Sequence, residues 1–263
     1  MNTLGILILA IVQGLTEFLP VSSSGHTVVL KELFGFKQEA GPALEMLLHA
    51  GTLVSVLVYY RKKVWELLTG LFHKNPQSWL YAVWVVISAV PAIIVYAGFH
   101  HQIDKAFDSP RLVAVMLLVT GVVLISTKFT WKDSGLAVKP LGWKRALAVG
   151  CAQAVAILPG ISRSGSTIST AKWLKVKTED AFEFSFIMSI PVLAGGILLE
   201  LKDFGELADS FDGGFGTLAL AFAASAIVGY FALALIVKCG FRGKFWMFGI
   251  YCLLAGLAVL IVA

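Results

Sequence analysis

The chain has 263 residues, of which 58% are hydrophobic and 14% charged, and its mean hydropathy is +0.84. This composition excludes an ordinary water-soluble domain and indicates a polytopic membrane protein. The net charge of +5 requires no nucleic-acid partner, because membrane proteins gather basic residues in their cytoplasmic loops. Cys151, Cys239 and Cys252 lie in apolar sequence and form neither a disulfide framework nor a metal-ligand pattern.

Six apolar runs are long enough to cross a bilayer as helices, which takes about 17 to 25 residues. They lie near residues 43–60, 79–99, 111–127, 183–200, 217–237 and 245–263. The number of Lys and Arg residues in the loops alternates: four in 61–78, two in 100–111, five in 128–145, one in 200–216 and three in 238–244. Because basic loops stay in the cytoplasm, the first, third and fifth loops are predicted to be cytoplasmic.

The segment 145–182 has to leave the cytoplasmic side and return to it, because a net crossing would invert the charge bias of the later loops. Pro159 and Gly160 break this segment, so half-helices over 146–158 and about 165–175 are predicted to meet near the bilayer centre. An arginine at that depth, Arg163, indicates a functional site. A helix N-terminus beside an arginine and several hydroxyls suits a phosphate group.

An offset of 140 positions, the separation of Gln13 and Gln153, aligns this motif with an N-terminal stretch that runs from Gln13 to Thr27. Five positions match: Gln13 with Gln153, Ser22 with Ser162, Ser24 with Ser164, Gly25 with Gly165, and Thr27 with Thr167. The two copies differ at three notable positions: Ser23 is aligned with Arg163, His26 with Ser166, and Glu17 with Ile157. The first copy therefore holds acid and base groups, and the second holds an anion clamp.

The same offset predicts a second re-entrant hairpin over residues 4–42, broken at Pro20 and entering from the opposite side. Each half is then one re-entrant helical hairpin plus three transmembrane helices, with repeat 1 over about 1–135 and repeat 2 over about 141–263. An odd number of crossings inverts the second repeat. The predicted fold is an all-α polytopic membrane protein, one integral membrane domain over 1–263, with an inverted-topology repeat whose tips meet at the midplane.

The two motifs resemble the signatures of the bacterial undecaprenyl-diphosphate phosphatase family, also known as bacitracin-resistance proteins. One is a Glu/Gln-x3-Glu motif, here Gln13-Gly-Leu-Thr-Glu17, which continues from Pro20 to His26. The other is an arginine motif, here Pro159-Gly-Ile-Ser-Arg-Ser-Gly-Ser-Thr167. The resemblance implies hydrolysis of undecaprenyl diphosphate to undecaprenyl phosphate and inorganic phosphate, which recycles the lipid carrier for peptidoglycan synthesis and confers bacitracin resistance.

The resemblance also implies a divalent cation, magnesium or calcium, and a site in the bacterial inner membrane that opens to the outer, periplasmic side. Gln13 stands where many members of the family have a first glutamate. The motif therefore retains Glu17 as its carboxylate and candidate metal ligand. Because of this substitution, the sequence does not determine which residues bind the cation.

Four residues are the candidate catalytic groups: Glu17, Ser23, His26 and Arg163. The planar fork of Arg163 suits a diphosphate, and a structural salt bridge to Glu17 is the alternative. Ser23 is the candidate nucleophile because its position is equivalent to that of Arg163. His26 either orients or deprotonates Ser23 or itself attacks phosphorus. Glu17 shares a helix face with Gln13 and serves as a cation ligand, a base or a buried hydrogen-bonding partner.

The other polar and glycine residues of the motifs are candidate substrate-binding groups, with helix capping as the alternative for the hydroxyls. These candidates are Gln13, Ser22, Ser24, Gly25, Ser162, Ser164, Gly165, Ser166 and Thr167. Glu45 and His49, four residues apart near the outer end of a span, are candidates to line the entrance or to add a cation ligand.

A secondary transporter or lipid flippase is the competing hypothesis, because crossed re-entrant hairpins at the midplane also occur in transporters. A carrier needs the arginine clamp but no nucleophile, so Ser23 and His26 opposite Arg163 favour the enzyme. A structural scaffold leaves the arginine and the serine clusters unexplained. The expected partners are the lipid diphosphate and the bilayer, without nucleic acid, and the sequence leaves a homodimer open.

Overall fold

The computed structural model describes residues 3–34, 41–130, 142–200, 214–241 and 243–262. Eleven α-helices and one short 3-10 helix account for most of these described residues. Five stretches are long and apolar enough to cross a membrane: Pro42–Tyr59, Pro76–Phe107, Pro110–Phe129, Thr178–Glu200 and Gly214–Gly240. The structure thus confirms an all-α, multi-pass membrane protein.

Prolines fix where three of the long helices begin. Helices α3 (Pro42–Tyr59), α5 (Pro76–Phe107) and α6 (Pro110–Ser126) each carry a proline at the first helical position, where no backbone N–H is needed. The side chains of Asn75 and Ser109 cap α5 and α6 by accepting a hydrogen bond from a backbone N–H of the first turn. These spans therefore begin within one to three residues of the predicted positions.

The remaining apolar helices are α9 (Thr178–Glu200), α11 (Gly214–Phe241) and α12 (Met247–Val262). The predicted span 245–263 is shorter in the structure, because turns occupy Gly243 to Trp246 and α12 has 16 residues. The short 3-10 helix η1 (Thr127–Phe129) extends the end of α6. The predicted loops 128–145 and 200–216 lie largely outside the described residues.

Each segment predicted as a hairpin contains two helices joined by a short break. The first consists of α1 (Thr3–Phe18) and α2 (Ser23–Phe34), with Pro20 in the break. The second consists of α7 (Gly142–Val155) and α8 (Arg163–Trp173), with Pro159 and Gly160 in the break. Helix α7 ends three residues before the predicted limit, because the chain already turns at residues 156–160. Helix α8 begins at Arg163 because Ser162 caps it.

Two of the predicted loops contain helix. Residues 61–78, predicted as a loop from their charge, form α4 (Arg61–Phe72), the turn that follows it and the start of α5. The loop predicted over 100–111 is largely helical, because α5 continues to Phe107 beyond a residue with non-helical geometry at Phe99. Their low hydropathy is the reason that these segments were predicted to lie outside the bilayer, but it does not prevent helix formation.

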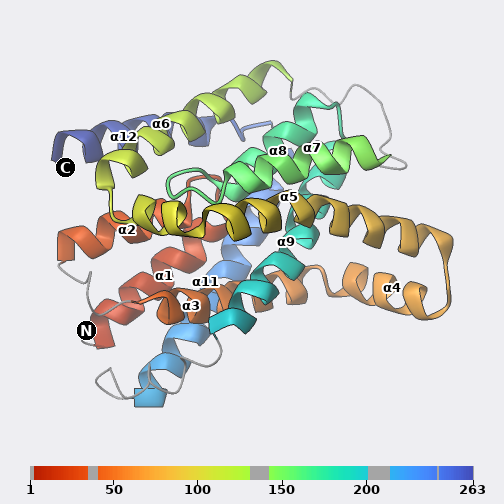
Figure 1. Ribbon diagram of the computed structural model, residues 1–263, viewed down its shortest axis with the longest axis horizontal. Helices are drawn as coiled ribbons and strands as arrows, with labels where there is room; N and C mark the ends of the chain where they lie inside the picture. The colour runs from red at the N-terminus through yellow and green to blue at the C-terminus, as the bar shows by residue number, and fades with distance from the viewer. Residues whose placement is uncertain (1–2, 35–40, 131–141, 201–213, 242, 263) are drawn as a thin grey trace.

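Helices of the first half pack against helices of the second half. Helix α1 lies against α11, and its counterpart α7 lies against α5; α3 packs on α9, and α6 packs on α12 (Figure 1). Glycines permit the close approach: a methyl group on Gly14 would lie 2.7 Å from the carbonyl oxygen of Ser225, and one on Gly150 would lie 2.5 Å from that of Ser88. Small residues at helix crossings are the usual way to pack helices in lipid. These contacts hold the two hairpins within one bundle.

Candidate functional site

The two hairpin tips contact each other through backbone and hydroxyl groups. The backbone N–H of Gly160 donates to Ser22 Oγ at 3.1 Å, and Ser164 Oγ donates to the carbonyl oxygen of Leu19 at 3.4 Å. Ser22 has a φ of 67°, a left-handed conformation that costs a non-glycine residue about 1 kcal/mol or more. Its contact with Gly160 helps to hold that conformation, so the breaks of the two hairpins form one structure.

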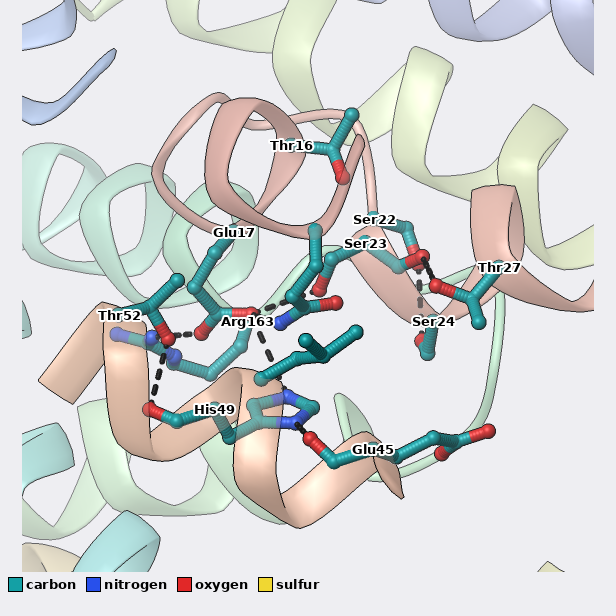
Figure 2. A network of polar contacts seen from close by, with 12 residues as sticks. Thr16, Glu17, Ser22, Ser23, Ser24, Thr27, Glu45, His49, Thr52 and Arg163 are labelled. Carbon is teal, nitrogen blue, oxygen red and sulfur yellow. Dashed lines mark hydrogen bonds and ion pairs between the residues drawn. The ribbon is translucent and has the colours of Figure 1, made fainter. Parts of the chain in front are cut away.

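An ion pair between the tips lies at the centre of the site. Arg163 Nη2 donates to Glu17 Oε1 at 2.5 Å. The other carboxylate oxygen, Oε2, accepts hydrogen bonds from Ser23 Oγ at 2.7 Å and from Gln13 Nε2 at 3.0 Å. Figure 2 shows the Glu17 carboxylate between the Arg163 and Ser23 side chains. Arg163 and Ser23 thus converge on the buried carboxylate of Glu17, which brings three of the four candidate catalytic residues together.

His49 belongs to this centre rather than to an entrance. Its Nε2 lies 3.5 Å from Glu17 Oε2, and its Nδ1 lies 2.8 Å from the backbone oxygen of Glu45 (Figure 2). The Glu45 side chain forms an ion pair with Lys31 of α2. Helix α3 therefore places an imidazole against Glu17 and ties its own first turn to the first hairpin.

His26 points to a different part of the fold. Its Nδ1 lies 2.8 Å from the backbone oxygen of Ser22, and its Nε2 lies 2.6 Å from the hydroxyl of Tyr251 on α12. The two rings are stacked, with centroids 5.7 Å apart. The structure thus directs both ring nitrogens of His26 to Ser22 and Tyr251 and does not bring them together with Ser23 Oγ. The role predicted for His26 stays a prediction.

Several of the predicted phosphate-binding hydroxyls hold the helix starts. Ser22 Oγ accepts from the N–H of Gly25 at 3.2 Å, and Ser162 Oγ accepts from the N–H of Gly165 at 3.0 Å. Ser24 Oγ and Ser164 Oγ each lie 3.3 Å from the hydroxyl of the serine two residues earlier. Thr167 is fully buried, where its hydroxyl contacts the backbone of Arg163 and the hydroxyl of Ser185. Ser166 lies partly exposed in the first turn of α8.

A cavity of about 210 Å³ lies beside the tips and is lined by both polar and apolar residues. The predicted site residues that line it are Glu17, Ser22, Ser23, Ser24, Ser162 and Arg163. His49, Glu45, Gln153, Thr16 and Ser189 complete its polar surface. Its apolar surface comes from Met46, Ala92, Phe107, Ala156, Ile157, Ile161, Val192 and Leu193. The remaining predicted site residues lie behind the lining: Gln13, Gly25, His26, Ser164, Gly165, Ser166 and Thr167.

Gln153 is a lining residue that the motifs did not identify as part of the site. It is 3% exposed, and among the described residues neither Nε2 nor Oε1 of its side chain has a hydrogen-bond partner. The same holds for Nη1 of Arg163. The match of Gln153 with Gln13 was the sequence signal that could have included it. Two residues that line the cavity thus carry buried polar atoms without a hydrogen-bond partner among the described residues.

The side chains at the tips can be compared with the ligands that a divalent cation prefers. Among the described residues, no group of three or more His, Cys, Asp or Glu side chains is arranged to hold a metal ion. The tips offer the carboxylate of Glu17 and serine hydroxyls, which are hard oxygen donors. Such a set matches magnesium or calcium better than a soft metal, provided that a ligand supplies further oxygens.

The fold and the site together define a class of protein: a multi-pass helical membrane protein with an arginine, a carboxylate and a serine at two broken-helix tips. The cavity is lined by both polar and apolar residues, which suits an amphipathic ligand with an anionic head. The chain belongs to the family of the bacitracin resistance protein BacA, whose model matches residues 6–258.

Relatives named undecaprenyl-diphosphatase match this chain over nearly its whole length. The protein from Desulfatibacillum aliphaticivorans is 37% identical over 277 residues, which cover 99% of each chain. Those from Korarchaeum cryptofilum and Rhodopirellula baltica are 39% and 38% identical and cover 97% and 98% of this chain, and 97% and 96% of their own length. The family that the motifs resembled is thereby confirmed.

Proposed function

We propose that this protein is an undecaprenyl-diphosphatase, which hydrolyses undecaprenyl diphosphate to undecaprenyl phosphate and inorganic phosphate. The observation that carries the proposal is the Glu17 carboxylate with Ser23 Oγ on one oxygen and Arg163 Nη2 on the other. The names of the full-length relatives support the same substrate. The product is the carrier lipid of peptidoglycan synthesis, so the activity would also protect the cell from bacitracin.

The contacts support a serine mechanism. Glu17 Oε2 accepts the hydrogen bond of Ser23 Oγ, so the carboxylate is placed to take the proton as Oγ attacks the terminal phosphorus. The bond from that phosphorus to the bridging oxygen breaks, and undecaprenyl phosphate leaves. Arg163 stabilises the negative charge that gathers on the phosphoryl oxygens. Water then attacks the phosphorus of the phosphoserine, the bond from Ser23 Oγ to phosphorus breaks, and the proton held by Glu17 returns to Oγ as phosphate leaves.

The apolar residues among those that line the cavity support a lipid substrate. Met46 of α3, Phe107 of α5 and Leu193 of α9 face the same cavity as the tips. A prenyl chain that lies along these residues keeps its apolar surface out of water, while the diphosphate reaches the polar tips. This arrangement favours a membrane-embedded lipid over a soluble phosphate ester.

A divalent cation, magnesium or calcium, is part of this proposal. Glu17 is the residue of this chain that would hold it, and oxygens of the diphosphate would complete its coordination. When bound, the ion neutralises charge on the diphosphate. Because Arg163 and Ser23 already contact the Glu17 carboxylate, we expect tight cation binding to require the diphosphate as well.

We also propose an inverted-topology repeat in the bacterial inner membrane, with two re-entrant hairpins and the site open to the periplasm. The order of helices repeats after about 140 residues, and α1 with α11 and α7 with α5 form equivalent pairs, which supports this topology. The orientation follows from the basic loop at residues 61–78. In a chain whose natural cysteines are replaced by alanine, Lys74→Cys should then react with a thiol reagent from the cytoplasmic side and Asp108→Cys from the periplasmic side.

Every residue in this mechanism belongs to one chain, so the proposal requires no homodimer. Transport of a lipid diphosphate across the bilayer is the alternative that the same tips would serve. It is tested by reconstitution in vesicles: a carrier keeps its transport when Ser23→Ala removes the nucleophile, and it releases no phosphate. A phosphatase instead loses phosphate release in that variant while it still binds the lipid.

A further inference from the structure

Gln153 is a buried amide without a hydrogen-bond partner. The residue lies in the last turn of α7, where its side chain is 3% exposed and lines the cavity beside the tips. Among the described residues, both Nε2 and Oε1 lack a partner. Buried polar groups in proteins nearly always have partners, because leaving one unpaired is unfavourable. An amide kept in this state on a cavity wall points to a ligand.

Comparison with the equivalent residue of the first repeat explains why Gln153 is left free. Gln13 occupies the same position in α1 and donates through Nε2 to Glu17, four residues later. The residue four positions after Gln153 is Ile157, whose side chain offers no acceptor. The same glutamine is thus paired within its helix in the first hairpin, and in the second it lies beside the cavity without a hydrogen-bond partner among the described residues.

A second unpartnered donor lies on the same hairpin. Arg163 Nη1 is buried and has no hydrogen-bond partner among the described residues, while Nη2 of the same guanidinium contacts Glu17. Both side chains line the same cavity. A ligand that satisfies both groups has to present acceptor oxygens to a cation and to an amide N–H. Phosphate oxygens meet this requirement.

We propose that Gln153 is a substrate-binding residue that donates a hydrogen bond from Nε2 to a phosphate oxygen of the diphosphate, together with Nη1 of Arg163. This inference rests on the proposed function, because it assigns the ligand of the same cavity. Gln153 then completes the anion clamp of the second hairpin, and Gln13 has the different task of holding Glu17 against Ser23.

Kinetics of phosphate release from undecaprenyl diphosphate test this assignment in the full-length protein. Gln153→Met keeps the length of the side chain and removes the donor, and we expect kcat/KM to fall about tenfold or more. Gln153→Glu replaces the donor by a negative charge facing phosphate, so its kcat/KM should fall further. Activity in Gln153→Glu above that of Gln153→Met would overturn the donor role.

Ser169 provides a matched control. It is fully buried in α8, its hydroxyl also lacks a partner among the described residues, and it does not belong to the cavity lining. If Gln153 were merely an unsatisfied packing residue, Ser169→Ala and Gln153→Met would behave alike, with unchanged kcat/KM. We expect Ser169→Ala to stay within about twofold of the wild type, so that the loss is specific to the cavity.

Thermal unfolding in detergent with added inorganic diphosphate separates this inference from the proposed function, because it requires no hydrolysis. Diphosphate should raise the unfolding temperature of the wild type and of Ser169→Ala, and it should do so much less for Gln153→Met. If diphosphate protected the wild type and Ser169→Ala much more than Gln153→Met, but the wild type released no phosphate from the lipid, the proposed function would fail and the role of Gln153 in binding would stand. If Gln153→Met kept both the protection and the kcat/KM of an active wild type, the role of Gln153 alone would be overturned.

Discussion

Arg163 Nη2 and Glu17 Oε1 lie 2.5 Å apart, although 146 residues separate the two side chains in the chain. Each residue comes from the tip of a different hairpin, and each is largely shielded from solvent. A buried pair of this kind is costly to break, because removal of one partner leaves the other charge unpaired. The same contact therefore aligns the two tips and holds the groups that the proposed reaction uses.

The Arg163–Glu17 pair should show strong coupling in stability. Arg163→Met removes the guanidinium from the buried Glu17 carboxylate, which keeps only its contacts with Ser23, Gln13 and His49, and we expect it to lower the free energy of unfolding by about 3 kcal/mol. The double variant Arg163→Met with Glu17→Gln should recover part of this loss, because no charge is left without a partner. Unfolding of the four proteins in detergent measures the coupling, and additive effects of the two substitutions would contradict a direct pair.

A covalent intermediate on Ser23 is the next prediction. Rapid acid quench of the enzyme with lipid labelled in its terminal phosphate should trap phosphoserine, which survives acid, and Ser23→Ala should abolish it. His26→Ala should still form the labelled serine, since the ring nitrogens of His26 contact Ser22 and Tyr251. An acid-labile phosphoryl group that is lost in His26→Ala and kept in Ser23→Ala would assign the attack to His26 instead.

Removal of divalent cations should stop the reaction and spare the fold. The tips offer the Glu17 carboxylate as the candidate ligand, and its contacts with Arg163 and Ser23 need no ion. We expect a chelator to abolish phosphate release with little change in unfolding temperature, and magnesium or calcium to restore activity. Glu17→Gln should need a much higher cation concentration for its residual activity. Unchanged cation dependence in Glu17→Gln would exclude this residue as a ligand.

Gly160 should tolerate no side chain. Its φ is +94°, and a methyl group on it would lie 2.4 Å from the backbone oxygen of Val113 in α6. The break is also fixed from α6, because Thr120 Oγ1 donates to the oxygen of Gly160 at 2.8 Å. We expect Gly160→Ala to destabilise the protein by about 2 kcal/mol or more and to separate the tips.

Gly142 is the control for this prediction, because it also has a positive φ, of +67°, but a methyl group there would meet no atom within 4 Å. Gly142→Ala should cost about 1 kcal/mol from backbone strain alone. The two variants are compared by thermal unfolding in detergent. Equal losses of stability in the two variants would mean that the close contact of Gly160 with α6 does not contribute to the effect of Gly160→Ala.

The hairpins were predictable because their determinants are local and repeated. Pro20 and Pro159 mark the breaks, and the offset of 140 positions pairs α2 with α8 almost residue for residue. The convergence of Glu17, Ser23 and Arg163 followed from the same pairing. A helix in the loop after α3 was missed because its charge indicated only that it lies outside the bilayer.

The directions of individual side chains were not predictable, because distant helices determine them. His26 is turned by Tyr251, which lies 225 residues away on α12, and His49 reaches Glu17 because α3 packs beside α1. Gln153 appeared in the alignment of the two repeats, but its free amide follows from Ile157 in place of a glutamate. The directions of these three side chains can therefore be read only from the folded structure.

The most direct test is phosphate release from undecaprenyl diphosphate by the detergent-purified protein, compared with Ser23→Ala and Arg163→Ala. We expect release that requires a divalent cation and falls by about a thousandfold or more in either variant, because one loses the nucleophile and the other loses the charge that stabilises the transition state. Folded wild-type protein that binds the lipid and releases no phosphate would contradict the account and favour transport.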